Sequence, residues 1–184
     1  EGFYASVLTP RGDYHIDPYQ KGDQSTYFSY FRRDLAPKFD GWQCLGAVEV
    51  DQPRSAYSRF VLARGGAGSG PTLKTFRLAM NATGEYTAAR GGTVTAARSA
   101  IVTSVNRVTG VYERDFCARL TLVYSNPYTN SGTDPFTNSD GFAMLSQNQS
   151  DLDTKWGNAN YDIGHVFSTG GGGVMISSDH TTKR

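Results

Sequence analysis

The 184-residue sequence has no long apolar run and no excess of one charge. No stretch reaches the roughly 18 consecutive apolar residues that a membrane-spanning helix needs, so we expect no membrane span. The 18 basic and 17 acidic residues leave a formal net charge of +1. Because Lys and Arg form no run that could follow a phosphate backbone, nucleic acid is not an expected partner.

Cysteine and histidine are also scarce, with two and three residues. Cys44 and Cys117 lack Cys-x-x-Cys spacing and lie in different regions, so one disulfide and two buried thiols are both consistent with the sequence. The three histidines, His15, His165 and His180, are scattered along the chain. A tetrahedral zinc site needs at least three ligands, usually two of them close in sequence. The scattered histidines therefore do not indicate a metal site.

Glycine and aromatic residues are abundant instead. The chain has 21 glycines and 12% aromatic residues, while charged residues make up only 19%. A charged fraction below the usual quarter, together with much Ser, Thr and Asn, is typical of secreted bacterial proteins. We therefore expect a secreted or extracellular location. Because the sequence starts at Glu1 without methionine and ends at Lys183-Arg184 after an apolar stretch, we also expect a segment of a longer protein.

Three regions follow one another along the chain. Residues 1–35 are predicted to be a small β-rich segment, with strands over 3–8, 14–17 and 26–32 and a turn over 9–13. Residues 36–71 contain Pro and Gly and end in the glycine-rich stretch 64–71, which is typical of a linker. The third region, 72–184, has a different pattern.

That third region is predicted to alternate strands with helices. Strands are expected over 73–80, 118–124 and 161–167. Apolar residues recur at steps of three and four from Val94 to Tyr112, which indicates an amphipathic helix that Thr93 caps. A second helix is expected from about Asp140 to Gly157, with an apolar face of Phe142, Leu145, Leu152 and Trp156. Helices between strands predict an α/β fold with a twisted, mostly parallel sheet in three layers.

Three stretches of sequence in this region resemble one known family. They are Thr72–Tyr86, Val102–Asp115 and, above all, the stretch Asn160–Gly173 with its strand and glycine turn. In this order and at these separations they resemble the reprolysin-like zinc metallopeptidases of secreted bacterial proteins, in the metzincin clan. The resemblance covers about 73–173. It implies a metzincin-like half domain over 72–184, a truncated N-terminal half of the catalytic domain, with residues 1–35 as the end of a propeptide.

The sequence departs from that family in its metal motif. Metzincins carry zinc on a His-Glu-x-x-His-x-x-Gly-x-x-His stretch, whose glutamate activates the zinc-bound water. This chain has no His-Glu pair, so we expect no zinc, no catalytic residue and no activity from the chain alone. The resemblance implies a zinc-dependent endopeptidase for the parent protein. Its peptide or protein substrate would lie along a cleft edge that begins at Gly172, Gly173 and Val174.

Other interpretations remain beside this one. The chain could be a non-catalytic extracellular binding or structural module on a decayed peptidase fold. A makeshift zinc site would need His165, His180 and one of Asp162 or Asp179 to meet. Because a half domain leaves one sheet face partly bare, self-association through that face is expected.

Two local motifs have ordinary structural interpretations. Arg11-Gly12-Asp13 is an adhesive tripeptide in other proteins but falls in a predicted hairpin turn. Asp134, Asn138 and Asp140 offer oxygen atoms to calcium, but their spacing is not that of an EF-hand, and Asp140 is well placed to cap the following helix.

Overall fold

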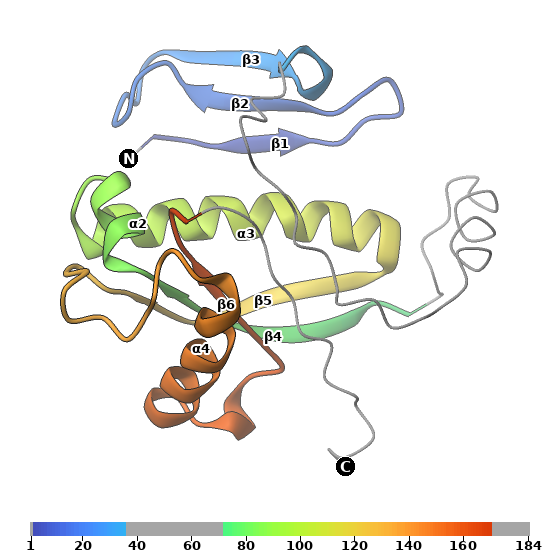
Figure 1. The fold of residues 1–184 in the computed structure, drawn as a ribbon. Coiled ribbons are helices and arrows are strands. Elements are labelled where there is room, and N and C mark those ends of the chain that lie inside the picture. Colours follow the sequence, from blue (N-terminus) through green and yellow to red (C-terminus); the bar gives the residue numbers. More distant parts are fainter. Residues whose placement is uncertain (1, 36–71, 171–184) are drawn as a thin grey trace.

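The computed structural model describes residues 2–35 and 72–170, which form two β-sheets on either side of a long helix (Figure 1). The N-terminal sheet is antiparallel, with strand order β1-β2-β3. Its elements are β1 (Ala5–Val7), β2 (Tyr14–Pro18), β3 (Tyr27–Phe31) and the short 3₁₀ turn η1 (Arg32–Asp34). This confirms the predicted β-rich segment.

The second sheet is parallel, with strand order β5-β4-β6. Its strands are β4 (Lys74–Ala82), β5 (Ala118–Pro127) and β6 (Ile163–Phe167). The helices are α2 (Gly84–Ala89), α3 (Val94–Phe116) and α4 (Gly141–Lys155), followed by the short turn η2 (Asn158–Asn160). Helix α3 packs on one face of this sheet and α4 on the other, which confirms the three-layer α/β prediction.

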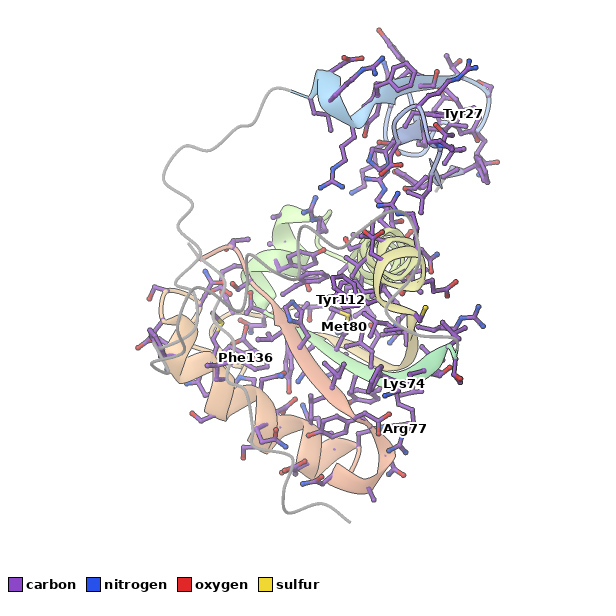
Figure 2. All side chains as sticks on the ribbon, turned by 90° about the vertical axis from the view of Figure 1, so that its right-hand side faces the viewer. Tyr27, Lys74, Arg77, Met80, Tyr112 and Phe136 are labelled. Carbon is purple, nitrogen blue, oxygen red and sulfur yellow. The ribbon has the colours of Figure 1, made fainter. Side chains whose placement is uncertain are left out.

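Helix α3 buries the central part of the stripe that its periodicity predicts, whereas Val94, Val108 and Tyr112 of that stripe are 37–43% exposed. Ala97, Ile101 and Val105 pack against Leu78 and Met80 of β4, and Met80 lies between helix and sheet in Figure 2. The helix starts where predicted, because the Thr93 hydroxyl accepts a hydrogen bond from the Ala96 amide at 3.1 Å. It continues one turn beyond the predicted end and stops at Cys117, which has a left-handed φ of 51°.

The buried face of α4 agrees with the predicted one only at Leu152. Met144, Asn148 and Leu152 are buried, whereas Phe142 is 54% exposed and Trp156 37% exposed. The prediction assigned the face by hydrophobicity, but Asn148 takes a central buried position because its side chain bonds to Asn81 of β4. The ends of the helix are as predicted: Asp140 caps it, and the chain turns at Gly157, where φ is +89°.

The N-terminal sheet lies on the side of α3 that faces away from the second sheet (Figure 1). Residues 36–71, the predicted linker, lie outside the described residues. None of the helices in the described part is long and apolar enough to cross a membrane.

Candidate functional site

The carboxyl ends of the parallel strands form the candidate site. Strand β4 ends at Ala82, β5 at Pro127 and β6 at Phe167. These residues are paired, so the polypeptide leaves all three strands along the same carboxyl-terminal edge of the sheet. Two backbone bonds hold these ends together: the Thr83 amide donates to the Phe167 carbonyl at 2.9 Å, and the Tyr128 amide donates to the Ala82 carbonyl at 3.0 Å. Ligands of open α/β sheets bind at the carboxyl ends of the strands, so this edge is the candidate binding site.

The loop over 128–140 closes tightly over this edge. Asp134 accepts hydrogen bonds from the amides of Gly84, at 2.6 Å, and Phe136, at 2.9 Å. A Cβ atom on Gly84 would lie 2.2 Å from the Ser131 amide nitrogen, so only glycine fits beneath the loop. Asp134 therefore serves the loop and the start of α2.

Asn138 connects the loop to the segments that follow β4 and β6. Its Oδ1 accepts from the Thr83 hydroxyl at 3.1 Å and from the Thr169 amide at 3.0 Å, while its Nδ2 donates to the Thr169 hydroxyl at 3.0 Å. A Cβ on Gly170 would lie 1.9 Å from the Asn138 carbonyl oxygen. Asn138 thus fixes the point at which the glycine run 170–173 begins. The predicted cleft-edge residues Gly172, Gly173 and Val174 lie outside the described residues.

A polar network on the α4 side supports the same edge. The buried Asn81 side chain donates to Asn148 Oδ1 and to Asp151 Oδ2, both at 3.0 Å. Tyr128 donates to Asp151 Oδ1 at 2.6 Å, and the Lys155 ammonium contacts both of these partners. Burial and the bond to Asp151 raise the pKa of Tyr128. These bonds hold α4 against the sheet, although the buried Asn81 Oδ1 has no hydrogen-bond partner.

A second cluster anchors the chain that enters β6. Tyr161 donates to Asp153 Oδ1 at 2.8 Å and accepts from the Gln149 side chain at 2.7 Å. Burial, together with the Asp153 carboxylate, raises the pKa of Tyr161 to about 12. This hydroxyl therefore stays protonated at neutral pH and serves as a structural donor.

The described residues do not fit a zinc ion. Among them, no group of three or more His, Cys, Asp or Glu side chains lies close enough to hold a metal. His15 lies in the N-terminal sheet and bonds to the Ser6 hydroxyl, while His165 lies in β6 with its ring 5.2 Å from that of Phe167. Asp162, one candidate for the makeshift site, is bound by Arg77. Its other proposed members, His180 and Asp179, lie outside the described residues.

The rival motifs have structural roles. Asp13 of the Arg-Gly-Asp tripeptide is only 16% exposed in its side chain and pairs with Arg114 of α3. Asp140 accepts from the amides of Phe142 and Ala143, both at 3.0 Å, as a helix cap. The cap interpretation therefore accounts for the bonds of Asp140, whereas the Asp13 side chain bonds to a helix that the turn interpretation did not involve.

Sequence reasoning missed helix α2 and the two asparagines that organise the edge. The signal for α2 was Thr83, whose hydroxyl accepts from the Tyr86 amide at 3.2 Å as an N-cap. The signal for Asn81 was a polar residue within the apolar carboxyl half of its strand, residues 78–82. Asn138 left no comparable signal, because a loop asparagine is common in any turn.

Comparison with known families agrees with this geometry. A family model described as metallo-peptidase family M12B, reprolysin-like, matches residues 72–175. The match covers more than half of the chain and includes the whole parallel sheet with α3 and α4. The chain matches no curated protein.

Proposed function

The chain belongs to the reprolysin-like metallopeptidases of family M12B, and on that premise we propose that residues 72–170 are the half of a catalytic domain that precedes the zinc-binding stretch. The parent protein would be a secreted zinc-dependent endopeptidase acting on peptides or proteins. The observation that carries the proposal is the family match over the entire parallel sheet, whose carboxyl edge is built as a fixed frame.

The frame has a specific task in this proposal. By anchoring Thr169 and approaching Gly170 closely, Asn138 sets the direction in which the chain leaves β6. The chain then runs through Gly172 and Gly173 to Val174, where an extended substrate would pair with the backbone as an added strand. The Asn138 bonds hold the chain at Thr169 and Gly170, just before the residues proposed to pair with substrate.

The zinc-binding motif of the family is not found in this sequence. When bound in a metzincin, zinc polarises the scissile carbonyl and lowers the pKa of its water. The chain has no His-Glu pair, and its described residues bring together no set of ligands, so we derive no chemical step from it. We expect the 184-residue chain to be inactive as a peptidase.

Exposed apolar side chains support the further proposal of self-association. Val108, Tyr112 and Phe116 of α3 and Ile163 of β6 each expose between 40% and 48% of their surface. A second copy of the chain would remove such residues from water. Sedimentation at increasing protein concentration tests this, since an Ile163→Gln variant should associate less than the unchanged chain.

The experiment that tests the proposed function is to determine the coding sequence beyond Arg184. A His-Glu-x-x-His stretch in frame downstream is the expected result. The extended chain should then cleave casein in the presence of zinc, while a variant with that glutamate changed to glutamine should not. A stop codon directly after Arg184, with a folded and monomeric product, would instead favour the alternative of a non-catalytic module.

A further inference from the structure

The N-terminal sheet is attached to α3 chiefly by charged groups. The Arg107 guanidinium of α3 pairs with Asp17 of β2, whose other oxygen accepts from the Tyr30 hydroxyl at 2.7 Å. Arg114, further along α3, pairs with Asp13 at 3.1 Å. Both aspartate side chains are only 16% exposed, so these pairs are shielded more than ordinary surface pairs.

A third polar contact reaches the start of α3. The Lys21 ammonium donates to the Arg90 carbonyl, at the end of α2, at 2.6 Å. It lies so close to the chain that a Cβ on Gly91 would be 2.4 Å from Lys21 Nζ. The three contacts therefore extend from the turn that precedes α3, at Arg90, to the last turn of the helix, at Arg114.

Apolar packing along the same seam is incomplete. A cavity of about 450 Å³ separates residues 2–4 from the first turns of α3, where Arg98 and Val102 line it. A second cavity of about 190 Å³ continues between residues 4–8 and the stretch of α3 from Thr103 to Gly110. Both hollows open to the surface, so this part of the seam lacks the close apolar packing of a protein core.

The sheet also contributes little to the core of the catalytic half. The buried residues of α3, Ala97, Ile101 and Val105, face the parallel sheet on the opposite side of the helix. Removing the N-terminal sheet would leave this cluster intact.

From these observations we infer that residues 2–35 are a separable module, which the outer face of α3 binds as a distinct partner through acidic-to-basic pairing. The module stays bound when the chain is cut between the two parts, and high salt releases it. Because it lies on the side of α3 away from the parallel sheet, it holds α3 without contacting the β6 edge. This inference does not depend on the proposed peptidase function.

The test uses the full chain with a site-specific protease sequence inserted between Pro37 and Lys38. After folding, the chain is cut and the two pieces are separated by size at low ionic strength and in 1 M NaCl. Cutting at this point keeps Cys44 and Cys117 on one piece, so no disulfide between them can link the fragments. We expect the pieces to elute together at low salt and apart in 1 M NaCl, where the screening length falls to about 3 Å.

Variants identify the pairs responsible. Asp13→Asn combined with Asp17→Asn should weaken binding of the labelled N-terminal piece by about tenfold or more, as expected for two partly shielded pairs. Asp34→Asn is the matched control: it removes the same charge from the same module, but Asp34 is 63% exposed and pairs with Arg33 of that module. A double-mutant cycle of Asp17→Asn with Arg107→Gln should be non-additive.

Two results would overturn the inference. One is separation of the cut pieces at low salt, with both pieces folded by circular dichroism. The other is equal binding at low and high salt that the Asp13 and Asp17 substitutions leave unchanged, which would mean that apolar contact holds the module.

Discussion

Arg77 of β4 and Asp162, the residue before β6, form a two-pronged ion pair. Arg77 Nη2 lies 2.7 Å from Asp162 Oδ1 and Nε lies 3.2 Å from Oδ2, while the Arg77 amide also donates to Oδ2 at 2.7 Å. A further bond from Arg77 Nη1 to the Ala159 carbonyl, at 2.8 Å, extends the contact to η2. Arg77, labelled in Figure 2, thereby sets where the chain enters β6.

Replacing this carboxylate should loosen β6 in a pH-dependent way. The bonds from the Arg77 side chain and amide lower the pKa of Asp162. Its contribution to stability is therefore complete above the ordinary value of 3.8 and is lost as the pH falls through the lower folded value. Asp162→Asn should melt at a lower temperature than the unchanged chain at pH 7. That difference should shrink below pH 3.8, and a constant difference down to pH 2 would contradict this account.

The core stripe of α3 makes a quantitative prediction. Ile101 is fully buried, so Ile101→Ala should reduce the free energy of unfolding by about 3 kcal/mol through lost burial and a remaining cavity. Val102, the next residue, is 40% exposed, and Val102→Ala should change it by about 0.5 kcal/mol or less. Urea denaturation of both variants measures the contrast. Equal losses would mean that the helix is rotated from the position described here.

The contrast between α3 and α4 shows what periodicity can predict. The buried residues of α3, Ala97, Ile101 and Val105, are all apolar and all lie on the predicted stripe. The same spacing also included Val94, Val108 and Tyr112, which are exposed toward the two ends of the helix. In α4 the buried stripe contains Asn148, whose burial depends on a partner in another strand. The hydrophobicity pattern contains no information about that partner. The prediction therefore placed the exposed Phe142, rather than Asn148, on the buried face.

Two glycines should respond oppositely to alanine. In Gly84→Ala the new methyl group would meet the backbone of Asn130 and Ser131, which cannot yield easily, so we expect a loss of about 2 kcal/mol. Gly110 lies inside α3, and its new methyl group would be 3.6 Å from Leu8 Cδ1, an ordinary contact. Gly110→Ala should stabilise the chain by up to about 1 kcal/mol through helix propensity. Thermal melting distinguishes the two, and a destabilising Gly110→Ala would show that the seam is tighter than described.

Acid should weaken the N-terminal sheet through His15. Burial, and then the positive charge of Arg107, lower the pKa of His15, with Arg32 acting in the same direction and Asp17 and Asp13 opposing it. Its contribution to stability is thus complete above about pH 6.5 and declines as the pH falls below that value, because the unfolded chain takes up the proton first. His15→Gln should flatten the dependence of stability on pH below 6.5. An unchanged slope in this variant would exclude His15 as the cause.

The site was less predictable than the fold. The resemblance located the glycine run, and the cap at Asp140 followed from residue type. The roles of Asn81 and Asn138 depend on chains that meet only after folding, over sequence separations of 67 and 31 residues. Such long-range polar bonds follow from the topology of the sheet, and single-sequence patterns do not encode them.

The zinc content of the purified 184-residue chain tests the central claim most directly. Protein prepared without a histidine tag is analysed for metal and melted with and without a chelator. We expect no stoichiometric zinc and a melting temperature that the chelator leaves unchanged, because the chain has no His-Glu pair. About one tightly bound zinc per chain, with a melting temperature that falls on chelation, would contradict it.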